Sequence, residues 1–180
     1  MGEKFKYRLS KDLKREIAQN LIDILQKDVN INKSTKTFIC NWLCTGPEEK
    51  RKAFFDVWEI VLKNYLPKER PILFRSCTRI SKKNKIASFT GSLKFARRFG
   101  NSKDYLLICD TKEELEFEEK FYKAGEYKHT FYPLVNVLIK ARESGGCGFS
   151  ERIWSYIDEE EYIMKIETEN INKLRWVKIN

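Results

Sequence analysis

The segment Pro71-Ile72-Leu73-Phe74-Arg75-Ser76-Cys77 divides the chain into two parts of different character. It predicts a buried strand, because a short apolar run that follows a proline and ends in polar residues is typical of strands. The sequence before it has helical periodicity, and the sequence after it contains several short apolar runs. Helices followed by short strands favour the α+β fold class.

Three helices are expected before this strand. The first spans 11–27, where Ser10 is a suitable N-cap and the apolar residues recur at helical spacing. The second spans 35–43 and is expected to begin at the cap Ser34. The third begins with Pro47 in its first turn, the position in a helix that tolerates proline best. We interpret these helices as structural packing.

The sequence after Cys77 alternates between strand and helix signals. A helix over 92–99 begins at the cap Ser92 and ends at Gly100. Residues 133–140 fit either a strand or a buried helix, and the glycines in 144–148 indicate a flexible loop. Further strands are expected at 86–90, 105–109, 161–167 and 173–179.

The composition fits a single folded domain. The chain has 180 residues, of which 42% are apolar and 34% are charged, as in globular proteins. We therefore expect one domain over 1–180, in which a helical lead-in (1–70) packs on a β core (71–180). No apolar run reaches the roughly 20 residues of a membrane span, and the N-terminus lacks the apolar segment of a Sec signal. A cytoplasmic protein is expected, and delivery into a target cell by a non-Sec route stays open.

The net charge, the histidine and the cysteines indicate which kinds of ligand the protein can bind. A net charge of +9 attracts anionic molecules, although a solvated lysine-rich surface gives the same number. His129 is the single histidine, and no cysteine spacing fits zinc, so a metal site is not expected. Cys40 and Cys44 lie four residues apart, and we expect all the thiols to be reduced.

Three segments contain polar or charged side chains within or next to apolar strands. Arg75 lies between apolar residues, where a guanidinium needs a phosphate or a carboxylate as partner. Ser88 and Thr90 share one side of a strand, because strand side chains alternate. Glu159 and Glu161 share a face, and their repulsion raises one of the two pKa values. The structural alternatives are an ordinary ion pair, a capped helix start and a solvated turn.

In this order the segments resemble the Arg-Ser-Glu class of mono-ADP-ribosyltransferases, and most closely its small phage-encoded and toxin-like members. The matching elements are Phe74-Arg75, Ser88-Phe89-Thr90, Ala96 to Phe99, and Glu159 to Glu161. The resemblance covers 71–166 by motif and the helical lead-in by layout. It implies an ADP-ribosyltransferase-like split β-sandwich of two small mixed sheets with an N-terminal helical portion.

The resemblance also implies an activity, the transfer of ADP-ribose from NAD⁺ to a macromolecular acceptor. Glu161 would stabilise the ribosyl cation, and Arg75 would clamp the pyrophosphate. Ser88 would orient one of these two residues, and backbone polar groups of Arg75 or Ser76 would hold the nicotinamide amide. The other candidates for NAD⁺ binding are Thr90, Phe95 and Phe99. The hydroxyl motif is looser here than in the family, so Ser88 and Thr90 both remain candidates for its central hydroxyl.

The acceptor would be contacted by Glu159, and by Trp154 and Tyr156 from a glycine-rich loop. In the family a glutamate at this place goes with arginine acceptors, which favours an arginine on a protein of the nucleic-acid machinery. A nucleobase of RNA or DNA is the alternative acceptor, and water is a third. The biological role implied is a toxin or host-directed effector, with an antitoxin or inhibitor as a further partner.

A hypothesis from another class is a non-enzymatic, basic nucleic-acid-binding module. Its stacking platforms would be Trp42, Trp58, Trp154 and Trp176. These tryptophans mostly occupy apolar helical or strand positions, which favours a place in the core instead.

Overall fold

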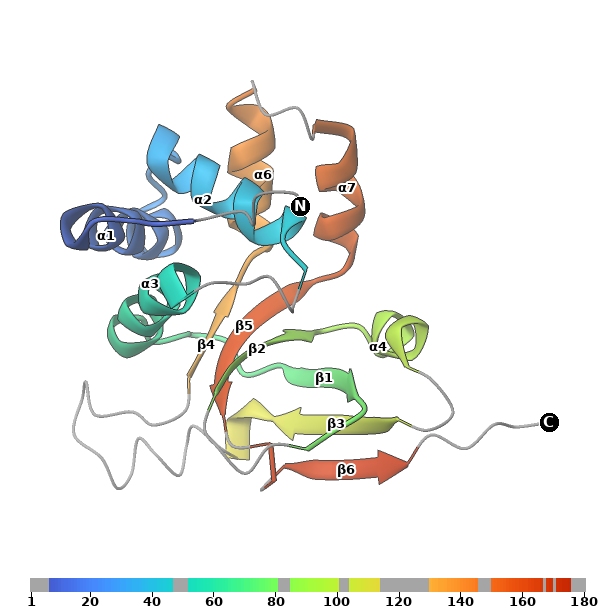
Figure 1. Cartoon of the computed structure of the whole chain (residues 1–180). Coiled ribbons are helices and arrows are strands. Elements are labelled where there is room, and N and C mark those ends of the chain that lie inside the picture. Colours follow the sequence, from blue (N-terminus) through green and yellow to red (C-terminus); the bar gives the residue numbers. More distant parts are fainter. Residues whose placement is uncertain are drawn as a thin grey trace, which may run out of the picture.

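The computed structural model describes residues 7–46, 52–80, 85–100, 104–113, 130–145, 150–166, 168–169 and 171–175. Within these ranges a group of helices packs against an antiparallel β-sheet, which confirms the α+β class (Figure 1). No helix among the described residues has the length and apolar character that a membrane span requires.

Helices α1 (Lys11–Lys27), α2 (Lys33–Cys44) and α3 (Lys52–Asn64) precede the first strand, as predicted. The hydroxyl of Ser10 accepts a hydrogen bond from the Leu13 amide at 3.2 Å, which confirms this residue as the cap of α1. The prediction for α2 is wrong at its start, because Asn32 rather than Ser34 is the cap: its Oδ1 accepts from the Thr35 amide at 2.7 Å. Pro47 lies outside the described residues.

The strands form one six-stranded sheet in the order β4-β5-β2-β1-β3-β6, and every pairing is antiparallel. The expectation of two separate mixed sheets is therefore wrong, since hydrogen bonds connect all six described strands. The strands are β1 (Ile72–Cys77), β2 (Lys85–Thr90), β3 (Tyr105–Asp110), β4 (Thr130–Pro133), β5 (Glu161–Ile166) and β6 (Asn172–Arg175).

Strands β1 and β2 pair with each other over a very short stretch. Strand β2 pairs with β5 over six residues and β1 pairs with β3 over six, but β1 and β2 pair only at Phe74 and Thr90. The sheet thus consists of an inner half (β4-β5-β2) and an outer half (β1-β3-β6); in Figure 1, β4 and β5 run steeply, whereas β1, β3 and β6 run across the view. Beyond the single pair, the facing backbone groups of β1 and β2 need other partners.

Two apolar clusters hold this arrangement together. The first fills the space between the helices and the inner half, where Trp58 of α3 contacts Tyr132 of β4 with ring centroids 5.7 Å apart. The second cluster draws Leu73 and Leu107 from the outer half and Phe89 and Met164 from the inner half. Both halves of the sheet therefore share one part of the core.

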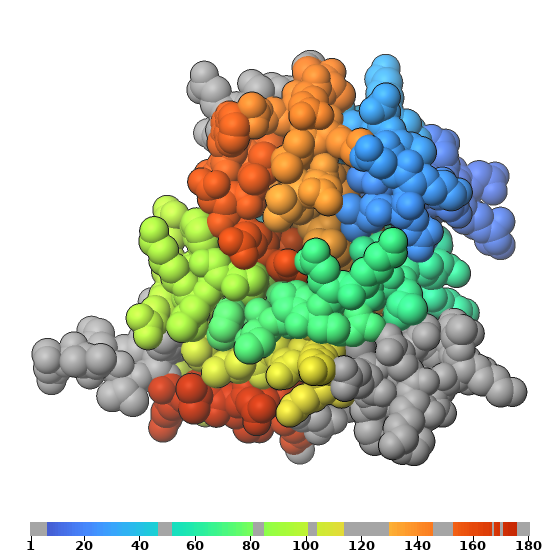
Figure 2. All heavy atoms as spheres, turned by 180° about the vertical axis from the view of Figure 1, so that it is seen from behind, coloured from blue at the N-terminus to red at the C-terminus, as the bar shows by residue number. Residues whose placement is uncertain are grey.

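Three further short helices are α4 (Leu93–Phe99), α6 (Val135–Glu143) and α7 (Ser150–Asp158). Of the two readings of 133–140, the helical one is correct for α6, which buries Val137, Leu138 and Ala141 on one face. The expected loop around Trp154 and Tyr156 is wrong, because both residues lie on α7. Figure 2 shows α4 (yellow-green) at the surface beside α7 (orange-red).

Two sequence details also need correction. Ser92 begins α4 but makes no side-chain capping bond; instead its amide donates to Thr90 Oγ1 at 3.0 Å. Cys40 is disulfide-bonded, whereas Cys44, Cys77 and Cys109 are in the reduced form. The expectation that all thiols are reduced is therefore wrong, since spacing along a chain does not reveal which cysteines meet in the fold.

We expect the change Tyr132→Phe to lower the free energy of unfolding by about 1 kcal/mol, the usual worth of a buried hydrogen bond. The buried Tyr132 hydroxyl donates to the Leu21 carbonyl of α1 at 2.6 Å and thereby ties the helices to β4. Burial raises the pKa of Tyr132 well above its ordinary value, so the hydroxyl remains a donor. Urea denaturation measures the effect, with Tyr105→Phe on β3 as the control. Equal stability of wild type and Tyr132→Phe would show that this bond contributes nothing.

Candidate functional site

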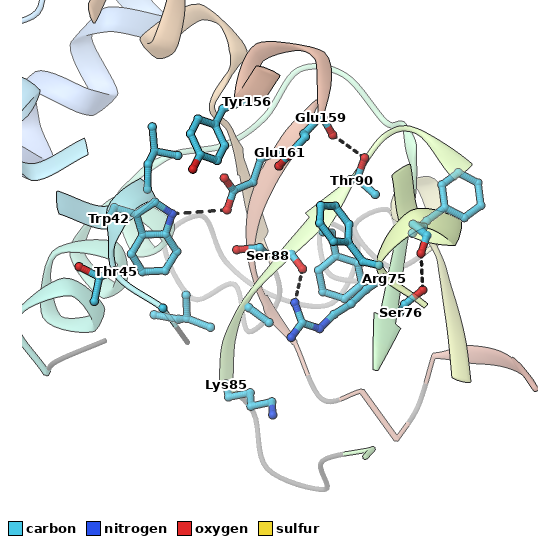
Figure 3. Close-up of a pocket in the computed structure, with 18 of the residues that line it drawn as sticks. Trp42, Thr45, Arg75, Ser76, Lys85, Ser88, Thr90, Tyr156, Glu159 and Glu161 are labelled. Carbon is cyan, nitrogen blue, oxygen red and sulfur yellow. Dashed lines mark hydrogen bonds between the residues drawn. The ribbon is translucent and has the colours of Figure 1, made fainter. Parts of the chain in front are cut away.

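A cavity of about 700 Å³ opens where the two halves of the sheet separate and the helices meet them (Figure 3). Its size lies within the range of about 300–1,000 Å³ that is usual for small-molecule sites. Most of the predicted site residues line it: Arg75, Ser76, Ser88, Thr90, Phe99, Tyr156, Glu159 and Glu161. A guanidinium, a hydroxyl and a carboxylate from distant segments thus share one cavity.

Two predicted residues, Phe95 and Trp154, are not among those that line the cavity. Phe95 is half-buried on α4, one helical turn before Phe99 and on a similar side of the helix, and it still does not reach the cavity. In α7, Trp154 and Tyr156 are two residues apart and point to opposite sides, because successive residues of a helix are rotated by about 100°. The Trp154 ring is 51% exposed, and the Arg142 guanidinium lies 3.2 Å from its centroid.

Arg75 bridges the two halves of the sheet. It projects from β1, and its Nη1 donates a hydrogen bond to the main-chain carbonyl of Ser88 on β2 (Figure 3). The guanidinium therefore replaces a sheet hydrogen bond where β1 and β2 no longer pair. Burial lowers the pKa of Arg75, while the nearby Cys77 and Glu161 raise it. A guanidinium has five N–H donors, so Arg75 has further donors that a ligand can use.

Glu161 is the first residue of β5, and it is held from two directions. Its main-chain carbonyl accepts a hydrogen bond from the Leu134 amide at 2.9 Å. Its Oε1 accepts one from Nε1 of Trp42 at 3.4 Å (Figure 3). Trp42 belongs to α2 and is only 2% exposed, so the helical lead-in supplies both a wall and a donor to the site. Sequence reasoning missed this role of Trp42.

Thr90 fixes the turn that leads into β5. Its hydroxyl donates to the Glu159 carbonyl at 2.5 Å and accepts from the Ser92 amide at 3.0 Å. Glu160, the next residue of this turn, has a left-handed backbone with φ 47°, and its carbonyl accepts from the Gly91 amide at 3.1 Å. Thr90 therefore holds the backbone that carries the two acidic residues, and both Thr90 and Ser88 line the cavity.

The acidic and the basic side chains that line the cavity lie at opposite ends of it. Glu159 and Glu161 lie in the upper part of Figure 3, and Arg75 and Lys85 lie in the lower part. Burial raises the pKa of Glu159, and so does the neighbouring Glu161, while Arg98 lowers it. A ligand with an anionic group at one end and a cationic centre at the other would be oriented by such a cavity.

Several lining residues were not singled out from the sequence. They include Thr45, Phe55 and Lys85. Only Lys85 carries a charge, and a lone lysine at a strand start cannot be told from other surface lysines by pattern. Among the described residues there is no cluster of three His, Cys, Asp or Glu side chains that could hold a metal ion.

Comparisons with models of protein families, with curated proteins and with solved structures found no match to this chain.

We expect Glu159→Gln to stabilise the protein increasingly as the pH rises. The pKa of Glu159 is raised above the ordinary 4.5, so the folded state binds the proton more tightly than the unfolded state does. The wild type therefore loses stability as the pH rises from about 4.5 through the higher, folded-state pKa, whereas the glutamine variant has no such loss. Thermal unfolding between pH 4 and pH 8 measures the difference. Glu143→Gln, an exposed change on α6, is the control. A difference between Glu159→Gln and wild type that does not grow with pH would contradict this origin of the shift.

Proposed function

We propose that this protein transfers ADP-ribose from NAD⁺ to a macromolecular acceptor. The observation that carries the proposal is that Arg75, Ser88 and Glu161 line a single cavity. These are the three residues that the Arg-Ser-Glu resemblance selects, and they come from β1, β2 and β5.

The separation of charge in the cavity matches the charge distribution of NAD⁺. Its pyrophosphate is anionic and would lie against the free donors of Arg75 and the ammonium of Lys85. The nicotinamide riboside carries the positive charge and would lie toward Glu161. The aromatic side chains of Phe55, Phe74 and Phe99 offer apolar surface for its rings.

The reaction needs a negative charge beside the ribose and a group that takes a proton. When the bond between ribose C1′ and the nicotinamide nitrogen breaks, the electron pair leaves with nicotinamide and C1′ becomes cationic. The Glu161 carboxylate, oriented by Trp42, would stabilise that cation. The acceptor then forms a bond to C1′ and loses a proton. Glu159 suits the role of base, because a raised pKa makes a carboxylate a stronger base near neutral pH.

The proposed biological role is that of a toxin or host-directed effector that uses this reaction, with an antitoxin or inhibitor as a partner. Hydrolysis of NAD⁺ uses the same residues with water as acceptor. A non-enzymatic module built on exposed tryptophans is less favoured, because Trp42 and Trp58 are 2% and 0% exposed and cannot stack on a ligand. Of the other two, Trp154 is covered in part by Arg142, and Trp176 lies outside the described residues.

We expect Glu161→Gln to lower the rate of ADP-ribose transfer by about 100-fold or more, the usual loss when a charge that stabilises a transition state is removed. The amide oxygen can still accept the Trp42 hydrogen bond, so the fold and the binding of NAD⁺ should change little. The measurement is nicotinamide release and transfer of label from NAD⁺, with circular dichroism as a check of folding. Near-wild-type rates in Glu161→Gln would remove this residue from the mechanism, and a wild type that consumes no NAD⁺ would refute the proposed function.

We expect Trp42→Phe to lower kcat about fivefold while KM for NAD⁺ changes less than twofold. Phenylalanine keeps the aromatic wall but lacks the N–H that orients the Glu161 carboxylate. Trp58→Phe is the matched control, because Trp58 Nε1 is buried without a hydrogen-bond partner in the described part of the chain, and Trp58 does not line the cavity. Equal kcat losses in the two variants would mean that only helix packing was disturbed.

A further inference from the structure

Helix α4 carries a row of positive charges beside the cavity. Lys94, Arg97 and Arg98 are all exposed. They occupy positions i, i+3 and i+4, which lie on one face of a helix with about 5–6 Å between neighbouring Cβ atoms. This α4 stripe is at the molecular surface, where Figure 2 shows α4 beside α7.

Within the described residues the stripe forms no ion pair, although the charge of Arg98 acts on the carboxylate of Glu159. The ion pairs of the described residues involve lysines of other elements, such as Lys14 with Asp56 and Lys165 with Glu59. Like charges three and four residues apart destabilise a helix, and α4 has only seven residues to offset that cost. An anionic partner that bound along the stripe would remove the repulsion.

The opposite side of α4 faces the cavity. Ala96 is buried there, and Ser76 of β1 donates its hydroxyl to the Ala96 carbonyl at 2.5 Å, which fixes the helix to the outer half of the sheet. Phe99 lines the cavity and is nevertheless 57% exposed, so one part of its ring is free at the surface. The charge of Arg98 acts on the carboxylate of Glu159. The stripe therefore borders the acidic end of the cavity.

From these contacts we infer that α4 is a docking face for a single-stranded nucleic acid, and that the acceptor of ADP-ribose is a base of that strand. The inference rests on the proposed function and names its acceptor. Phosphates would lie along the α4 stripe, and a base would stack on the exposed part of Phe99, which is the usual combination in proteins that bind single strands. A duplex would keep its bases stacked and out of reach of the cavity.

The same charges disfavour an arginine side chain as acceptor. A guanidinium that approached Glu159 would meet Arg98, and along α4 also Arg97 and Lys94. An exocyclic amine of a base is neutral and arrives on a strand that the stripe attracts. In the transfer, the amine nitrogen forms the bond to C1′, the bond from C1′ to nicotinamide breaks with its electron pair, and the amine proton passes to the Glu159 carboxylate.

Binding is tested first without NAD⁺, with the full chain and fluorescent single-stranded RNA and DNA of mixed sequence, by anisotropy at several salt concentrations. We expect the double change Arg97→Gln and Arg98→Gln to weaken binding at least tenfold at low salt. The slope of log affinity against log salt should fall by about 1.4, since each phosphate contact on a single strand contributes about 0.7. Phe99→Ala should weaken binding about tenfold, because it removes stacking, and leave the salt slope unchanged.

The matched control removes two exposed lysines from other helices, Lys11→Gln on α1 and Lys63→Gln on α3. We expect it to retain most of the affinity. Equal losses in the control and the α4 variant would overturn the docking face, because net charge alone would then explain the binding.

Transfer is tested next, with NAD⁺ labelled in the ADP-ribose and either the oligonucleotides or an arginine-rich peptide as acceptor. Label on the single strand, lost in the α4 variant, supports the inference. Label on the peptide alone overturns it and leaves an arginine as the acceptor. Nicotinamide release without label on any strand also overturns it, while the NAD⁺ chemistry of the proposed function stands. No nicotinamide release under any condition refutes the proposed function itself.

Discussion

The bond from the Arg75 guanidinium to the Ser88 carbonyl is the interaction on which the candidate site depends. Strands β1 and β2 pair at a single position and then separate, so one side chain has to satisfy backbone groups that a regular sheet would pair. The separation of the strands creates the opening, and the guanidinium connects the two strands there while it lines the cavity. An apolar residue at position 75 would leave the carbonyl unpaired, and a lysine would lack the planar fork that serves two partners.

The helical lead-in belongs to the site as well as to the core. Trp42 packs among the aromatic residues of the helices, with its ring 5.5 Å from that of Trp58, and its N–H reaches the carboxylate of Glu161. The hydroxyl of Tyr132 connects the same helices to β4. Packing of the helices on the inner half of the sheet therefore determines where the Glu161 carboxylate points. A change in helix packing would alter the chemistry even though the chain segments are far apart.

The sequence predicted what local patterns determine. Helix α1 and its Ser10 cap, and the strand around Arg75, follow from periodicity and capping. The α7 helix was missed because glycines nearby suggested a loop, so the side to which Trp154 points could not be derived. The pairing of all six strands into one sheet, the Trp42 contact with Glu161 and the disulfide of Cys40 depend on residues distant in sequence, which no local pattern reports.

A crystal structure of the protein with NAD⁺, or with a non-hydrolysable analogue, tests most directly whether the cavity is a dinucleotide site. We expect the pyrophosphate to lie against Arg75 and Lys85, and the nicotinamide ribose to lie beside Glu161 with C1′ facing Glu159. Soaks at millimolar concentration that leave the cavity unoccupied, or that place the dinucleotide elsewhere on the molecule, would contradict this assignment.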